Sequence, residues 1–120
     1  MKILIAEDDN LIRKTIEIKL EREGHEIISC SEGVAALENI RTRLPDIVIT
    51  DIMLPSASGL EIVSAVKDMT EKDIRVMVLS AMGQENIVEE AFRLGADDYM
   101  TKPFSLTELS IRVKKLMGIK

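Results

Sequence analysis

The sequence predicts an α/β fold built on an open, doubly wound sheet of five parallel strands with five helices. Short apolar runs rich in β-branched residues recur along the chain and do not alternate with polar residues, which is typical of strands covered on both faces. Segments with helical periodicity lie between these runs. Glycines, prolines and helix-capping sequences mark the boundaries. Together these observations indicate a β-α unit repeated five times.

The predicted strands are short and aliphatic. They cover residues 3–6, 27–30, 47–50, 76–79 and, more weakly, 99–100. In the first helical segment Ile12, Ile16 and Leu20 share one face, and the last carries an apolar stripe over residues 106–117. All three aromatic residues lie in the last third of the chain, so the core must be aliphatic. The seven methionines are expected to fill core space.

Capping residues support the helix boundaries. Ser58 with Glu61, and Ser105 with Glu108, each read S-x-x-E, which is the capping box of a helix start. Glycines at positions 24, 95 and 118 stand where helix C-terminal glycines belong. The three prolines, at positions 45, 55 and 103, lie outside every periodic run and therefore in connections.

Alternating strands and helices imply a parallel sheet with right-handed crossovers. Five units are too few for an eight-stranded barrel, so we expect a flavodoxin-like sheet in the strand order 2-1-3-4-5, forming a single domain over residues 1–120. In such sheets ligands bind beyond the carboxyl ends of the strands, where the strand order reverses. With that order the first and third strands are neighbours at this point.

Composition excludes several functional classes. The net charge of −5 argues against binding of nucleic acid or an anionic membrane by this domain, because both need a cationic surface. A single cysteine, Cys30, can form neither an internal disulfide nor a zinc cluster. The apolar start is too short for a signal peptide, and no stretch approaches transmembrane length. We therefore expect a cytoplasmic protein.

Polar residues follow the predicted strands, so they should meet at one edge of the sheet. The acids Glu7 and Asp8 follow the first strand and Asp51 follows the third, while Ser80 and Lys102 follow the fourth and fifth. Clustered carboxylates repel one another, and their charge must be offset by cations. Lys102 supplies one positive charge, and Mg²⁺ suits a site of few carboxylates, water and a phosphate oxygen. The sequence thus predicts phosphoryl transfer, with an aspartate as nucleophile.

Four motifs carry a family resemblance. They read I-L-I-A-E-D-D, D-I-M-L-P-S-A-S-G, V-L-S-A and G-A-D-D-Y-M-T-K-P-F, each in order and at a strand end. The chain resembles, over essentially its whole length, the receiver domain of two-component response regulators. Such a domain is a phosphorylation-dependent signalling switch. It is not an enzyme in the usual sense, because it catalyses only its own phosphorylation and dephosphorylation.

The resemblance assigns roles by position. It implies that Asp51 accepts the phosphoryl group from a histidine kinase, a phosphotransfer protein or a small phosphodonor. It implies that Mg²⁺ is held by side chains and one main-chain oxygen, and that two residues move on activation. The ligands are Glu7, Asp8, Asp51 and the backbone carbonyl of Met53; Lys102 pairs with the phosphoryl oxygens; Ser80 and Tyr99 form the switch. The Lys102–Pro103 peptide is expected to be cis.

Two finer expectations concern regulation. The G-A-D-D-Y stretch and the basic residues after it resemble the subgroup that forms homodimers through the fourth helix, fifth strand and fifth helix. The resemblance also implies that side chains two residues past the acceptor and past the switch serine influence how long the phosphoryl group survives. Here both are methionine, Met53 and Met82, which orient water poorly, so we expect slow self-dephosphorylation.

Three alternatives remain open at this stage. An aspartyl-nucleophile phosphatase needs a second acid two residues after the nucleophile, where this chain has Met53. A flavodoxin-like electron carrier would place its cofactor phosphate against Glu7 and Asp8, which repel it, and no Gly-rich nucleotide loop is present. A receiver-like domain that only binds a partner is the strongest rival, although this chain keeps all the pocket residues. The sequence does not identify the kinase, the stimulus or the output.

Overall fold

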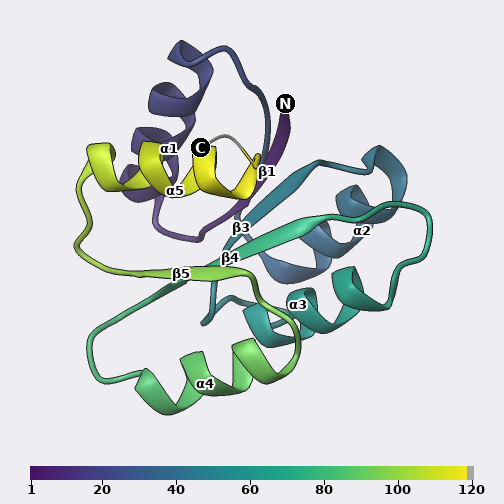
Figure 1. Cartoon of the computed structure of the whole chain (residues 1–120). Coiled ribbons are helices and arrows are strands. Elements are labelled where there is room, and N and C mark those ends of the chain that lie inside the picture. Colours follow the sequence, from purple (N-terminus) through teal and green to yellow (C-terminus); the bar gives the residue numbers. More distant parts are fainter. Residues whose placement is uncertain (119–120) are drawn as a thin grey trace.

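The computed structural model describes residues 1–118, which form five β-α units in sequence (Figure 1). The strands are β1 (Lys2–Ala6), β2 (Glu26–Cys30), β3 (Ile47–Asp51), β4 (Arg75–Ser80) and β5 (Asp98–Thr101). The helices are α1 (Asn10–Arg22), α2 (Gly33–Arg43), α3 (Gly59–Asp68), α4 (Glu85–Arg93) and α5 (Leu106–Leu116). None of these helices is long and apolar enough to cross a membrane.

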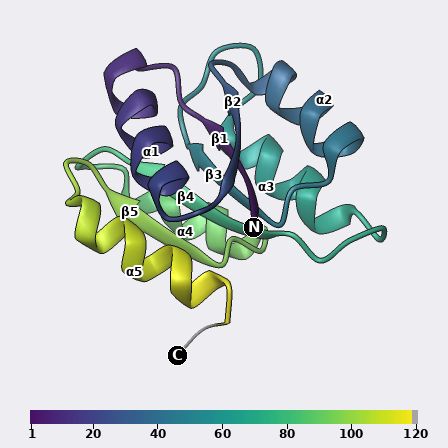
Figure 2. The same cartoon turned by 90° about the horizontal axis from the view of Figure 1, so that it is seen from above.

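All strands pair in parallel in the order β2-β1-β3-β4-β5, which confirms the predicted topology. Helices α1 and α5 cover one face of the sheet, and α2, α3 and α4 cover the other (Figure 2). The register places Ala6 beside Thr50, and Asp51 beside Leu79. The residues that follow β1, β3 and β4 therefore meet at one edge of the sheet.

Alternate residues of each strand supply two separate cores. In β1, Ile3 and Ile5 pack with α1 and α5, whereas Leu4 and Ala6 pack with the helices of the opposite face. Both clusters are aliphatic, as the placement of the aromatic residues predicted. Burial on both faces explains why the strand sequences show continuous apolar runs without alternation.

The cap predictions are confirmed. Ser58 accepts a hydrogen bond from the Glu61 amide at 3.3 Å, and Ser105 accepts one from the Glu108 amide at 3.0 Å. The glycines at positions 24, 95 and 118 all have positive φ. The sequence did not predict that Leu44, the C-cap residue of α2, has φ 45°, because a leucine gives no signal for a left-handed residue.

Two sequence interpretations need correction. Strand β5 extends over four residues, twice the predicted length, because Asp98 and Thr101 also pair with β4. Not all methionines fill the core: Met77 and Met100 are buried, but Met53 and Met82 are 57% and 79% exposed. Met53 and Met82 lie in loops that follow strands, which leaves their side chains in contact with solvent.

Candidate functional site

The loop between β1 and α1 supplies the first acids of the site. The Glu7 side chain is fully buried, whereas Asp8 is exposed. Asp9 is the N-cap of α1 and accepts a hydrogen bond from the Ile12 amide at 3.0 Å, so it serves the helix and leaves the other two acids for the site. The Asp9 amide in turn donates to Glu7 Oε2 at 3.0 Å, which fixes the buried carboxylate.

Lys102 joins the acids of β1 and β3. Its Nζ atom lies 2.6 Å from Glu7 Oε1 and 2.7 Å from Asp51 Oδ2. The peptide between Lys102 and Pro103 is cis, as the family resemblance implied. The lysine ammonium therefore offsets two carboxylates that folding has placed together.

The pKa values of these groups reflect burial and pairing. Burial raises the pKa of Glu7 above its ordinary value, and the hydrogen bond from Lys102 only partly opposes this effect. Burial by itself would lower the pKa of Lys102, but its bonds to Asp51 and Glu7 outweigh burial and raise that pKa. At neutral pH the lysine is thus held in its charged form beside the acids.

The same acids fit a hard divalent cation. Glu7, Asp8 and Asp51 each offer one carboxylate oxygen, and these oxygens lie within 4.8 Å of one another. Glu7 Oε1 is buried and contacts the Lys102 ammonium at 2.6 Å, which leaves one lone pair of that oxygen for a cation. A donor set made only of oxygen atoms, with an unused lone pair, suits Mg²⁺.

The loop after β3 is held tightly against Asp51. The Met53 amide donates to Asp51 Oδ1 at 3.3 Å, and the Gly59 amide donates to the carbonyl of Ile52 at 2.8 Å. A Cβ atom at Gly59 would lie 2.3 Å from the Asp51 carbonyl oxygen, so only glycine fits there. This close approach keeps the main chain of Met53 at the edge of the acidic cluster.

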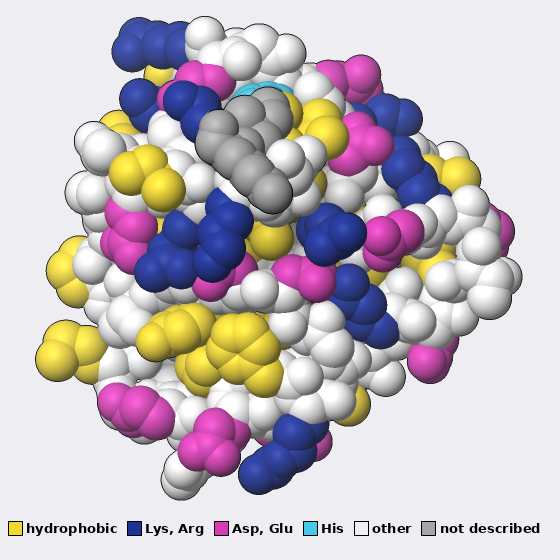
Figure 3. Space-filling model, in the orientation of Figure 1, with side chains coloured by type: hydrophobic (Ala, Val, Ile, Leu, Met, Phe, Trp, Pro, Cys, Tyr) yellow, Lys and Arg dark blue, Asp and Glu magenta, His cyan; other side chains and the backbone are white. Residues whose placement is uncertain are grey.

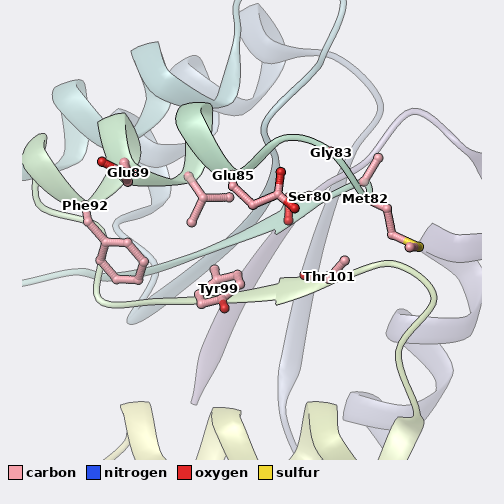
Figure 4. Close-up of a pocket in the computed structure, with 10 residues that line it drawn as sticks. Ser80, Met82, Gly83, Glu85, Glu89, Phe92, Tyr99 and Thr101 are labelled. Atoms are coloured by element: carbon pink, nitrogen blue, oxygen red, sulfur yellow. The ribbon is translucent and has the colours of Figure 1, made fainter.

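Ser80 and Tyr99 lie on neighbouring strands beside the acids. The Ser80 hydroxyl is buried and donates to the Met100 carbonyl at a long 3.5 Å. The Tyr99 ring is 40% exposed and meets Phe92 of α4 edge to face, with ring centres 5.8 Å apart. Figure 4 shows Phe92 on α4, Tyr99 on β5 and Ser80 at the end of β4. Tyr99 therefore points outward in this structure.

An open groove of about 580 Å³ runs between α4 and β5 and reaches Ser80 at one end. In Figure 3 hydrophobic side chains gather over this region, with acidic groups along α4 and basic groups towards α5. Residues of both elements line the groove, among them Val88, Phe92, Tyr99 and Thr101. The groove connects the candidate site to the outer face formed by α4 and β5.

Sequence reasoning missed several contacts around this site and on the neighbouring strand β5. Arg13 of α1 donates to the Glu7 carbonyl at 2.8 Å, which steadies the acidic loop from its own helix. Gln84 accepts from the amide of Ala81 at 2.7 Å. Arg112 of α5 pairs with Asp98 at 2.7 Å, whereas Asp97 pairs with Lys67 of α3 at 2.8 Å. In the sequence, only the position of Arg13 one turn into α1 could have indicated its contact with the Glu7 carbonyl.

Known proteins resemble this chain in sequence. Residues 3–114 match the family model described as the response regulator receiver domain. A response regulator of Streptococcus pneumoniae, RR06, is 40% identical over 118 residues, which cover 98% of this chain and 53% of that protein. The alkaline phosphatase synthesis transcriptional regulatory protein PhoP of Bacillus subtilis is 36% identical over 116 residues, covering 97% and 48%. The chain spans about half the length of the curated relatives it matches.

Solved structures agree with the sequence matches. The structure of a response regulator from Chloroflexus aurantiacus, described as putative, superposes with a TM-score of 0.91 at 31% identity and covers 98% of this chain and 97% of that one. The Francisella response regulator 1452 receiver domain gives 0.87 at 34% identity, covering 98% and 96%. The acidic edge, the parallel sheet and these matches lead to one conclusion: this chain belongs to the receiver domain family of two-component response regulators.

Proposed function

We propose that residues 1–120 form a single receiver domain in which Asp51 accepts a phosphoryl group and thereby switches an output. The observation that carries the proposal is the bridge from Lys102 to both Glu7 and Asp51, at 2.6 and 2.7 Å. A lysine in this position can meet phosphoryl oxygens when they arrive at Asp51. The donor is a histidine kinase, a phosphotransfer protein or a small phosphodonor, and the exchange takes place in the cytoplasm.

The chemistry follows from the residues at the edge of the sheet. A carboxylate oxygen of Asp51 attacks the phosphorus atom, the bond to the donor breaks, and the donor leaves with the electron pair, so that Asp51 carries an acyl phosphate. Glu7, Asp8, Asp51 and the backbone carbonyl of Met53 would hold Mg²⁺, which supplies charge to neutralise the phosphoryl oxygens. Lys102 contributes the second cationic contact, and the Met53 amide, already bonded to Asp51, helps to orient the carboxylate.

The output signal travels through the outer face. In the proposal, Ser80 turns from the Met100 carbonyl towards the phosphoryl group, and Tyr99 moves inward from its exposed position against Phe92. Both moves change the face made by α4, β5 and α5. This face then controls an output domain or a partner, with homodimer formation as one consequence.

The rival functions have less support from the site. The exposed Met53 side chain lies where a phosphatase of this type needs an acid. The buried negative charge of Glu7 would repel the phosphate of a flavin cofactor. A domain that only binds a partner would not need a lysine held between two carboxylates beside a third.

Incubation with acetyl phosphate and Mg²⁺, followed by intact mass spectrometry, tests the proposal. We expect the wild-type protein to gain one phosphoryl group and Asp51→Asn to gain none. Asp73→Asn, which replaces a carboxylate on a side chain 76% exposed to solvent, is the matched control and should be modified like the wild type. Equal modification of Asp51→Asn and wild type would show that another residue is the acceptor.

A further inference from the structure

The loop between β4 and α4 is closed by a side chain with no assigned role. Gln84 Oε1 accepts a hydrogen bond from the Ala81 amide at 2.7 Å. Gly83, with φ +88°, makes the turn that brings the Gln84 side chain back onto Ala81. Figure 4 shows this loop leading from Ser80 through Met82 and Gly83 into α4. The residue that is held, Ala81, directly follows Ser80.

This bond does not cap the helix. Gln84 stands at the N-cap of α4, yet in the described part of the chain its side chain accepts from no amide of α4. The amides of Ile87 and Val88 bond instead to the Gln84 backbone carbonyl, both at 3.0 Å. Loss of the Gln84 side chain would therefore leave the first turn of α4 bonded as before. It would remove the hydrogen bond that holds the β4–α4 loop at Ala81.

Ser80 is itself held by the Lys102 amide, which donates to the Ser80 carbonyl at 2.7 Å, so the bond from Ala81 to Gln84 is one restraint among several. The Ser80 hydroxyl bonds to Met100 at 3.5 Å, close to the limit of a useful hydrogen bond, and the Ala81 amide bonds to Gln84 at 2.7 Å. Since Asp51 lies beside Leu79 in the sheet, Ser80 is one residue beyond the level of the acceptor. Displacing the Ser80 backbone towards the site would pull the Ala81 amide away from the Gln84 oxygen.

We propose that Gln84 is a positioning residue: by holding the Ala81 amide, it keeps the β4–α4 loop and Ser80 in the arrangement of the unphosphorylated protein. This proposal rests on the proposed function of Asp51 and Ser80, and it concerns the ease of switching at that same site. A ligand that favours the switched state works against the bond from Ala81 to Gln84. Gln84 thus sets part of the equilibrium between the two states.

The composition of the chain provides a direct probe of this equilibrium. Tyr99 is the only tyrosine, so 3-fluorotyrosine labels one position, on the strand beside Ser80. The ¹⁹F resonance of the wild type is recorded with and without Mg²⁺ and beryllofluoride, which imitates a phosphoryl group. Three variants are compared with it: Gln84→Ala removes the acceptor, Gln84→Glu keeps an oxygen at the same reach, and Asn86→Ala is the control. Asn86 lies in the first turn of α4 and is exposed.

Without beryllofluoride, we expect the Gln84→Ala resonance to be displaced towards the position that wild type reaches only with it. Beryllofluoride should bind this variant about three- to tenfold more tightly, as expected for loss of one hydrogen bond that opposes the switch. Gln84→Glu and Asn86→Ala should have the same ¹⁹F resonance position and the same beryllofluoride affinity as the wild type. In urea without beryllofluoride, the folding equilibrium constant of Gln84→Ala should fall by the same three- to tenfold relative to Asn86→Ala, because the lost bond stabilises the unswitched state, and a larger fall would indicate a general loss of stability.

Two results would overturn the proposal, and they are distinguishable. If wild type responds to beryllofluoride but Gln84→Ala matches it in resonance and in affinity, Gln84 does not position the loop. If the wild-type resonance does not respond at all, the proposed switch itself fails, and the role of Gln84 fails with it. A displaced resonance in Asn86→Ala equal to that in Gln84→Ala would assign the effect to α4 in general and would also reject the proposal.

Discussion

Glu7 and Asp51 are two carboxylates that folding removes from water, and one lysine between them offsets their charge. Such a cluster destabilises the folded protein, because a buried carboxylate beside another carboxylate is favoured in its protonated form. The raised pKa of Glu7 expresses this cost. We therefore expect that replacing a buried carboxylate of this cluster with an uncharged side chain raises the free energy of unfolding when no cation is bound.

The first prediction concerns Glu7→Gln. In EDTA at pH 7 the free energy of unfolding should rise by about 1 kcal/mol, because the amide needs no desolvation of charge. In the wild type, the folded state binds the Glu7 proton more tightly than the unfolded state, so stability should fall as pH rises from 4.5 through the raised pKa. The variant should lose this slope.

Urea denaturation across that pH range is the measurement. The exposed Glu38→Gln serves as the matched control and should keep the wild-type slope. A Glu7→Gln variant that is less stable than wild type in EDTA would contradict the claim that the buried Glu7 carboxylate destabilises the folded protein.

The second prediction concerns Met53 and Met82, two exposed methionines in the loops that follow β3 and β4. A thioether accepts only weak hydrogen bonds and orients attacking water poorly. Replacing Met53 with Asn and Met82 with Glu should speed loss of the phosphoryl group by roughly tenfold, a small part of what a positioned polar group can supply. Phosphate release after removal of the phosphodonor gives the rate. The Met53→Leu, Met82→Leu protein should keep the slow rate, and equal rates in both double variants would reject the role of these positions.

At the scale of elements, α2 is docked by its first residue onto the loop after β3. The Gly33 amide donates to the Pro55 carbonyl at 2.9 Å, and Ser56 Oγ accepts from the Val34 amide at 3.0 Å. A Cβ atom at Gly33 would lie 1.8 Å from the Ala57 carbonyl oxygen, a rigid backbone atom. The loop that carries Met53 thus receives support from α2 as well as α3.

The third prediction follows from this docking. Gly33→Ala should lower the free energy of unfolding by about 3 kcal/mol, at the upper end for overpacking, because no flexible side chain can move aside. Gly83→Ala is the comparison: its Cβ would meet nothing within 4 Å, and only its φ of +88° opposes alanine. This second change should cost about 1–2 kcal/mol. Urea denaturation compares the two, and an equal loss would mean that close packing of α2 on the loop contributes nothing.

At the scale of the whole molecule, β5 is an edge strand of the sheet, and its outer side forms one face with α4 and α5. The face carries exposed apolar groups, including Ile111 at 61% exposure, among ion pairs such as that between Arg112 and Asp98. Asp98 Oδ2 is buried and has no hydrogen-bond partner within residues 1–118. A second copy on this face is the proposed consequence of switching.

The fourth prediction tests that consequence by analytical ultracentrifugation. With Mg²⁺ and beryllofluoride the wild type should sediment as a dimer, and Ile111→Glu should remain a monomer because it places charge within the apolar part of the face. Ile18→Glu alters another exposed isoleucine, on α1 at 44% exposure, and should still form the dimer. A wild type that stays monomeric at high concentration would exclude this use of the face.

Sequence alone predicted the fold, and it predicted that two acids and one lysine meet at the candidate site. Short runs rich in β-branched residues, such as 47–50, indicate strands buried on both faces, and parallel strands bring Asp51, Glu7 and Lys102 to one edge. These inferences succeed because the local sequence pattern identifies each strand, and parallel pairing then places the carboxyl ends of all strands at the same edge of the sheet. The cis peptide before Pro103 came from the family resemblance, since the local sequence does not determine it.

Only the tertiary structure decided which side chains meet and which remain free. The bond from Ala81 to Gln84, the contact of Arg13 with Glu7 and the docking of Gly33 join residues through turns whose geometry no pattern specifies. Exposure of Met53 and Met82 likewise depends on where the loops after β3 and β4 run. Hydrophobic pattern determines which residues must be buried, but contacts among polar and loop residues depend on the path of the whole chain.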